Sequence, residues 1–246
     1  AYAYSEAPPT KVRPRSNVRI RLCKYHACEG HPFAQCPLNG YFLKNLKAWS
    51  RITKQLYVWH YNTNFSHYLM PFPDFDELAA DLPAYPNYGV VGLFMQGSLT
   101  RGGRSENADL RAYVISKLLW DTKVDVNRLI REFHDAYYED AATPMLQYFE
   151  LMQRQVRPAP DGRGEHLWIY SRTDAPHLSD EFLTQATALF QRAAASAKSG
   201  AVRERVRNAR RSIDYIQLMR AKQFVVKGDW FAPADLDGLR ARWQAF

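Results

Sequence analysis

The spacing of hydrophobic and polar residues in the first half of the chain predicts strands that alternate with helices. Short apolar segments rich in β-branched and aromatic residues end at polar or breaker-rich loops, as strands do; they span residues 1–5, 18–23, 56–61 and 90–96. Longer segments carry apolar residues at helical spacing, at residues 41–52, 74–85 and 108–120. From the second strand onward, each predicted strand is therefore followed by a predicted helix.

This alternation predicts a parallel sheet covered by helices, because the strands are too apolar to leave one face in water. The loops after the strands are long, whereas the turns at residues 53–55 and 87–89, which precede strands, are short. Such asymmetry is typical of a (β/α)8 barrel, where the loops that follow the strands build the active site. Since a barrel needs eight strands, we predict an α/β fold in which residues 1–121 form the C-terminal half of a TIM-type barrel. We expect the other half upstream in a longer protein.

Residues 122–246 are predicted to form an all-α helical domain behind this half-barrel. Apolar residues recur at helical spacing at residues 124–138, 143–156, 179–198 and 202–224. The strand signal in this part is limited to the short run at residues 167–170. No apolar run approaches the roughly 18 residues that span a bilayer, so we expect no membrane partner.

The chain has 246 residues and a net charge of +8, and much of the basic excess lies near its C-terminal end. The last predicted helix carries Arg203, Arg205, Arg207, Arg210 and Arg211 beside an apolar stripe. Such a helix can bind nucleic acid or an anionic surface, or it can be the solvated face of an amphipathic helix. We favour the solvated face and expect no nucleic-acid partner, because no nucleic-acid motif or aromatic stacking residue accompanies the arginines.

All three cysteines, Cys23, Cys28 and Cys36, lie in one short segment together with His26 and His31. Thiolates and imidazoles are the ligands that zinc prefers, but the C-x4-C-x7-C spacing lacks the paired motifs of common zinc sites. One disulfide with a spare thiol, or three loop cysteines, fits the spacing better. We therefore expect no metal and no cofactor.

A dense set of polar side chains follows the third strand and indicates a pocket for a sugar. Amide, imidazole and phenol groups satisfy hydroxyls, and flat aromatic rings provide an apolar face on which a sugar lies. The candidate substrate-binding residues are Trp59, Tyr61, Asn62, Asn64, Tyr68 and Gln96. Gln96 is the strongest candidate, because it is a polar residue at the end of an apolar strand. The alternative is a buried aromatic strand and an irregular loop, in which Asn64 and Tyr68 only cap the loop.

Several motifs resemble a bacterial family called domain of unknown function 4838: VWHYNTNFSHYLMPFPDFDEL, GVVGLFMQGS, LRAYVISKLLWD and FHDAYYEDAATPMLQYFELM. The similarity covers residues 1 to about 156. It implies a glycosidase-type TIM barrel with a C-terminal helical extension, often behind an α-glucuronidase-like N-terminal domain. The resemblance also implies a periplasmic or secreted location. In many members an acidic residue stands at the position of His60 or of Met95, and this chain has no carboxylate at either.

The candidate catalytic residues are Glu6 and His60. Glycoside hydrolysis normally needs two carboxyl groups that flank the scissile bond, and Glu6 is the acidic residue that follows a predicted strand. His60 is added because an unperturbed imidazole titrates near neutral pH and can assist proton transfer. Asp74 and Glu77 begin a predicted helix, where the helix dipole explains them. The remaining catalytic carboxylate is expected outside this chain.

These patterns lead to two hypotheses about function. The first is a glycoside hydrolase-like protein that hydrolyses or binds a glycan through the strand-end pocket, with a carbohydrate as its partner. The second is a non-catalytic glycan-binding or scaffold domain that keeps the hydrolase fold without its carboxylates. The two differ in whether acidic residues stand at the ends of the barrel strands.

Overall fold

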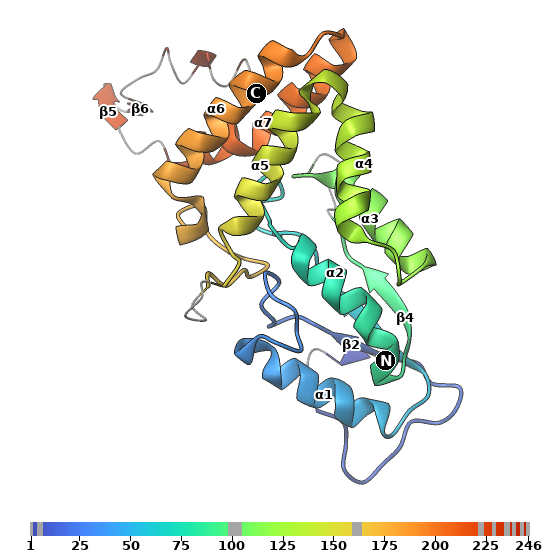
Figure 1. Ribbon diagram of the computed structural model, residues 1–246. Helices are drawn as coiled ribbons and strands as arrows, with labels where there is room; N and C mark the ends of the chain where they lie inside the picture. The colour runs from blue at the N-terminus through green and yellow to red at the C-terminus, as the bar shows by residue number, and fades with distance from the viewer. Residues whose placement is uncertain are drawn as a thin grey trace.

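A small parallel sheet forms the N-terminal part of the protein, as the computed structural model in Figure 1 shows. The structure describes residues 2–3, 7–97, 105–158, 164–220, 224–227 and 230–233, with positions 237, 240, 241 and 244. The strands are β1 (Tyr2–Ala3), β2 (Ile20–Cys23), β3 (Leu56–His60) and β4 (Val90–Met95), in the order β1-β2-β3-β4. Every neighbouring pair is parallel, so the predicted parallel sheet is confirmed.

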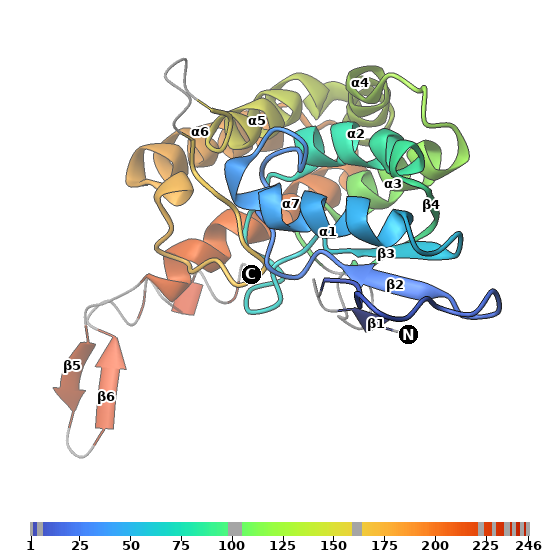
Figure 2. The same cartoon turned by 90° about the horizontal axis from the view of Figure 1, so that it is seen from below.

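One face of the sheet is covered by helices α1 (Gly40–Ser50), α2 (Phe75–Ala84) and α3 (Ala108–Trp120) (Figure 2). Strands that follow one another in sequence are also neighbours in the sheet. With right-handed crossovers, this order places the connecting helices on the same face. Short 3-10 helices precede α1 and follow α2, at Pro37–Asn39 (η1) and Tyr85–Tyr88 (η2). The described residues 7–19, between β1 and β2, contain no helix.

The second half of the described chain is helical as far as Met219, as the spacing predicted. Its helices are α4 (Val126–Tyr138), α5 (Ala142–Arg154), α6 (Asp180–Ser196) and α7 (Gly200–Met219), with 3-10 turns η3 (Glu139–Ala141) and η4 (Pro176–Leu178). Helix α5 packs against α4 and α6, and α6 packs against α7. Their buried apolar side chains join those of the sheet in one continuous core. Among the described residues, no helix has the length and apolar character needed to cross a membrane.

Two predicted elements differ from the structure. The last helix was predicted to reach residue 224 but ends at Met219, and an antiparallel hairpin follows, β5 (Phe224–Lys227) and β6 (Trp230–Pro233). Its residues are β-branched and aromatic, and this propensity outweighs the helical spacing that runs into it. Residues 167–170, predicted as a strand, have no regular secondary structure. The carbonyl groups of Leu167 and Ile169 accept hydrogen bonds from Glu29 and Phe65, which lie in separate loops and form no neighbouring strand.

Two arginines of α7, Arg205 and Arg210, contact other groups of the chain. Arg205 donates to the carbonyl oxygen of Tyr137 at 2.8 Å, and its guanidinium lies 4.7 Å from the centroid of the Tyr137 ring. Arg210 pairs with Asp214, one turn along the helix, at 3.2 Å. These contacts fit the interpretation of α7 as an amphipathic helix packed against the core.

The other face of the sheet carries aromatic and apolar side chains that the helices do not cover. Val91 and Phe94 of β4 are 58% and 39% exposed. The guanidinium of Arg21 lies over the rings of Trp59 and Phe94, at 5.8 and 5.4 Å from their centroids. A sheet face with this composition is typical of one that packs against further structure.

A buried lysine, Lys24, joins the sheet to α2. Its ammonium group donates to Glu29 at 2.9 Å, to Asp81 at 3.2 Å and to Glu77, and all four side chains are buried. Burial alone would lower the pKa of Lys24, but the three carboxylates raise it well above its usual value. For the acidic residues burial acts in the opposite direction, and it raises the pKa of Glu29 and of Glu77 to about 8. We refer to these four residues as the Lys24 cluster.

The Lys24 cluster should be essential for stability. We expect Lys24→Met to lower the free energy of unfolding by about 3–5 kcal/mol, because it leaves three buried carboxyl groups without their cation. The loss should grow as the pH rises through the pKa of about 8 of Glu29 and Glu77, because the remaining carboxyl groups must then stay protonated. Urea unfolding of the full-length protein at several pH values measures this, with Lys44→Met on the exposed side of α1 as the matched control. Equal stability of the two variants would contradict the role of the cluster.

Gly92 in β4 should also be sensitive to substitution. Tyr57 lies beside Gly92 in the neighbouring strand β3, and its ring covers this position. A Cβ atom at Gly92 would overlap the ring. We expect Gly92→Ala to cost about 1–3 kcal/mol, because the ring must leave its rotamer or the strands must separate. Gly40→Ala is the control, since a Cβ atom there meets open space, and it should change stability by less than about 0.5 kcal/mol. A Gly92→Ala variant as stable as Gly40→Ala would show that the ring is not held against β4.

Candidate functional site

An aromatic cluster lies at the edge of the sheet where the strands end. Tyr61 packs with Cys23 and Ile169, and half-buried aromatic side chains surround them: Tyr25, Trp59, Phe65 and Tyr170. Tyr25 follows β2, Trp59 lies in β3, and Tyr61 and Phe65 follow β3, whereas Tyr170 comes from the loop before α6. We call these five aromatic residues the edge cluster. Three segments distant in sequence therefore build one aromatic surface.

Trp59 and Tyr61 point to the same side of the sheet and stack on each other. Their ring centroids are 5.9 Å apart and the ring planes differ by 19°. Tyr61 is the buried ring and Trp59 is the partly exposed one. The indole nitrogen of Trp59 donates to the side-chain oxygen of Gln96 at 2.7 Å, which holds the ring at the end of β4. All three residues were predicted from the sequence as substrate-binding candidates, and the structure brings them together.

Asn62 and Gly97 form one wall of a small cavity. Gly97 has a φ of 59°, a left-handed conformation that favours glycine, and its N–H donates to the side-chain oxygen of Asn62 at 3.0 Å. The cavity has a volume of about 370 Å³ and lies between the end of β4 and the start of α3. Asp109 and Arg111 also line it.

Of the other two predicted residues, Asn64 bonds within its own loop, and Tyr68 contacts the edge cluster through Phe65. The side-chain oxygen of Asn64 accepts hydrogen bonds from the backbone N–H groups of Ser66 and His67, both at 2.9 Å, and its amide donates to the carbonyl oxygen of Ser171. Asn64 therefore caps its own loop, which was the alternative interpretation of the sequence. Tyr68 is partly exposed beside Phe65, with ring centroids 6.3 Å apart.

His60 lies on the helix-covered face of the sheet and not with the edge cluster. Its ring is fully buried and bonds to the hydroxyl of Tyr85 at 2.9 Å and to Glu77 at 3.1 Å. Burial lowers its pKa to about 3, so the imidazole is neutral at neutral pH. This position gives His60 a structural role beside the Lys24 cluster and no access to a ligand at the strand edge. Glu6 lies outside the described residues.

The acidic residues at the start of α2 and α3 also have specific partners. Arg111 donates to Asp74 at 3.1 Å and to Glu106 at 2.9 Å, and all three side chains are buried. Together with the Lys24 cluster, this shows that the helix dipole does not by itself explain Asp74 and Glu77. Asp109 accepts a hydrogen bond from the hydroxyl of Tyr137 at 2.6 Å and remains exposed.

Three members of the edge cluster, Tyr25, Phe65 and Tyr170, were not predicted from the sequence. The hydroxyl groups of Tyr25 and Tyr170 lie 3.2 Å apart, although 145 positions separate them in sequence. Tyr25 directly follows the residue after β2, so its place after a strand was a usable signal. Tyr170 lies in the run at residues 167–170, whose apolar character was visible and whose position in the fold was not.

Among the residues that the structure describes, two groups of side chains have the donor atoms of a metal site. Glu29, His60 and Glu77 form the first, but both of its carboxyl groups already contact the ammonium group of Lys24. The second group contains Cys28 and Cys36, two of the three cysteines, and all three are free thiols. Of the two expected arrangements, the structure has three cysteines without a disulfide. Burial would raise the pKa of Cys28, but its contacts with His31 and His166 lower it to about 6. The cysteine segment is therefore held near imidazoles and not cross-linked.

Comparison with known proteins identifies the family. The sequence profile of a family described as Domain of unknown function (DUF4838) matches residues 1–150, which contain the whole parallel sheet, α1 to α4 and most of α5. No curated protein and no solved structure matches the chain. Because the profile covers more than half of the sequence, the chain belongs to this family with a domain of unknown function, DUF4838.

Proposed function

We propose that the chain binds a carbohydrate at its edge cluster, as the sugar-recognition part of a glycoside hydrolase-like protein. The observation that carries this proposal is the gathering of Tyr25, Trp59 and Tyr170 at the strand ends, partly exposed and close to amide groups. Stacked aromatic rings accept the apolar face of a sugar, and neighbouring amides and phenols satisfy its hydroxyl groups. Exposed Trp168 extends the surface, with its ring centroid 5.0 Å from that of Tyr170.

The proposal includes a half-barrel for residues 1–121. Sequential parallel strands with helices on one face are the arrangement of a (β/α)8 barrel, where the other face lines the interior. The uncovered face, with Val91, Phe94 and Trp59, supports this assignment because it offers apolar surface to a further part of the sheet. In such a barrel, the edge cluster lies at the rim where active sites are built.

Hydrolysis depends on carboxyl groups that are accessible at this rim. Within the described residues near the strand ends, Glu29, Glu77 and Asp81 belong to the Lys24 cluster, and Asp74 and Glu106 pair with Arg111. Asp109 is exposed, and its carboxylate accepts a hydrogen bond from the hydroxyl of Tyr137. Glu6, which follows β1 in the sequence, is the candidate acid/base in this chain. A second carboxyl group would come from the upstream half-barrel.

Loss of an exposed ring should weaken glycan binding. We expect Trp59→Ala and Tyr170→Ala in the full-length protein each to raise the Kd for a bound oligosaccharide roughly tenfold, about 1.4 kcal/mol, because the sugar loses its aromatic contact. Calorimetric titration against a panel of neutral and acidic oligosaccharides measures this. Trp120→Ala is the matched control, since Trp120 is 92% exposed at the end of α3, away from the edge cluster. Unchanged affinity in both test variants would remove the edge cluster as the binding site.

Glu6→Gln separates a hydrolase from a binding protein. If Glu6 acts as acid/base, turnover of aryl glycosides or aryl uronides by the full-length protein should fall by at least about a hundredfold, because a positioned proton donor contributes that much. Binding of the same glycan should persist, since the amide keeps the shape of the carboxyl group. Turnover that is unaffected by the substitution would place both catalytic carboxyl groups elsewhere.

A further inference from the structure

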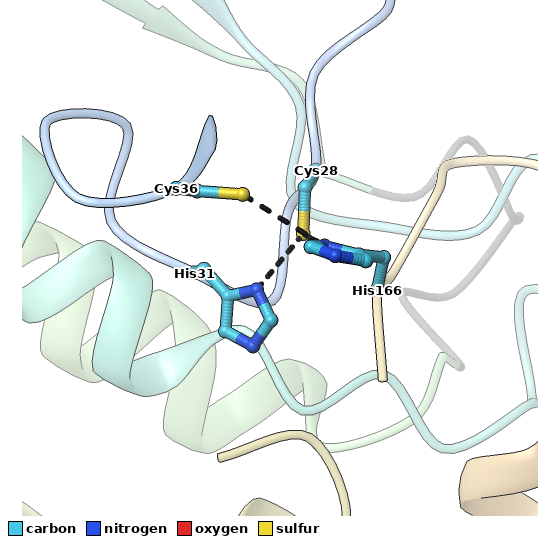
Figure 3. Close-up of side chains that lie close together, drawn as sticks. All are labelled: Cys28, His31, Cys36 and His166. Atoms are coloured by element: carbon cyan, nitrogen blue, oxygen red, sulfur yellow. Dashed lines mark hydrogen bonds between the residues drawn. The ribbon is translucent and has the colours of Figure 1, made fainter. Parts of the chain in front are cut away.

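Four side chains from two distant segments meet at one point: Cys28, His31, Cys36 and His166 (Figure 3). Their sulfur and ring-nitrogen atoms all lie within 4.8 Å of one another. Cys28 Sγ is 3.5 Å from His31 Nδ1 and 3.3 Å from His166 Nδ1, and Cys36 Sγ is 3.7 Å from His166 Nδ1. The sequence did not predict His166 as a member of this group, because 130 positions separate it from Cys36.

These separations match the edges of a tetrahedral zinc site. Zinc binds sulfur at about 2.3 Å and imidazole nitrogen at about 2.0–2.1 Å, which places the two kinds of ligand about 3.6 Å apart in a tetrahedron. The three measured sulfur-to-nitrogen distances, 3.3, 3.5 and 3.7 Å, scatter around this value. Two thiolates and two imidazoles are a common donor set of structural zinc sites.

His31 is oriented as a metal-binding histidine. Its Nε2 atom lies 2.6 Å from the carbonyl oxygen of Val156, just after α5. Because a carbonyl oxygen only accepts, Nε2 carries the proton, and the lone pair of Nδ1 points toward Cys28. A metal-bound histidine usually donates its second N–H to a carbonyl or carboxylate in this way.

Asn39 holds the loop that carries three of the four side chains. Its side-chain oxygen accepts from the N–H of Cys28 at 2.7 Å, and its amide donates to the carbonyl oxygens of Cys28 and His31 at 2.9 and 3.2 Å. Asn39 is fully buried, so these bonds fix the loop before any ion binds. Such preorganisation lowers the entropy lost when a loop chelates a metal.

We propose that Cys28, His31, Cys36 and His166 bind a structural Zn²⁺ ion. Four protein ligands complete the tetrahedron and leave no position for a reacting water, which distinguishes a structural site from a catalytic one. Three ligands are buried and His166 is exposed, so the ion enters from the surface and His166 closes the site.

The zinc site would join the loop after β2 to the segment that contributes Tyr170 to the edge cluster. His166 lies four positions before Tyr170, and the neighbouring Leu167 accepts a hydrogen bond from the N–H of Glu29 at 2.7 Å. The ion therefore supports the contact between Tyr25 and Tyr170. Zinc binding itself does not depend on the proposed glycan binding, so either proposal stands if the other fails.

Metal analysis of the full-length protein, purified without chelators, tests the proposal. We expect about one zinc ion per chain in the wild type. After dialysis against a weak chelator, His166→Asn and Cys36→Ser should each retain at least about tenfold less zinc. His26→Asn is the matched control, because His26 is an exposed histidine in the same loop and should keep the wild-type zinc content. Since His166 is also exposed, His166→Asn should fold normally, and circular dichroism checks this.

Cobalt substitution gives a second readout that does not depend on stoichiometry. Co²⁺ in this site should show the intense visible bands of tetrahedral coordination and a near-ultraviolet band from thiolate ligands, and Cys36→Ser should weaken the latter. A protein without zinc would overturn the proposal, and so would zinc that persists in His166→Asn. A disulfide between Cys28 and Cys36 in the purified wild type would overturn it as well.

Discussion

The buried ammonium group of Lys24 is the constraint on which the N-terminal half of the structure depends. A charge without access to water is stable only when its partners surround it. Here the partners come from separate elements, because Glu29 follows β2 whereas Glu77 and Asp81 lie on α2. The position of α2 over the sheet is therefore fixed by charge as well as by apolar contact. A shift of α2 by one residue would leave carboxylates buried and unpaired.

The Lys24 cluster also determines which polar residues are free to bind a ligand. Side chains alternate along β3, so Val58 and His60 face the helices while Trp59 faces the other side. His60 bonds to Glu77 in the interior, so its side chain is not available to a ligand at the strand ends. The aromatic residues on the opposite face remain for the edge cluster. Because His60 and Trp59 lie on opposite faces of β3, a pocket on one face of the sheet cannot contain both side chains.

The sequence predicted the strands and helices well because their signals are local. Period-two and helical spacing located β2 to β4 and α1 to α6 within a few residues, and the polar ends of β3 and β4 led to Trp59 and Gln96. Residues brought in by tertiary contact had no local signal. His166 stands alone in a polar loop, and the acidic residues of α2 look like ordinary helix-start residues until Lys24 is placed beside them. Spacing within a single segment was also a poor guide to the cysteines, because their fourth partner comes from the other half of the chain.

The segment from residue 164 to 171 shows how a metal ion would add a tether to the edge cluster. It has no regular secondary structure, and it is attached to the loops after β2 and β3 by a few hydrogen bonds, such as Phe65 N–H to the carbonyl oxygen of Ile169 at 2.8 Å. With few backbone hydrogen bonds, the segment depends on its buried side chains, Leu167 and Ile169, to stay closed. A binding surface on such a segment loses affinity whenever it opens, because only the closed fraction is competent to bind. A metal ligand at His166 would hold this segment closed without covering the rings that face solvent, so structural and binding roles are compatible within one short loop.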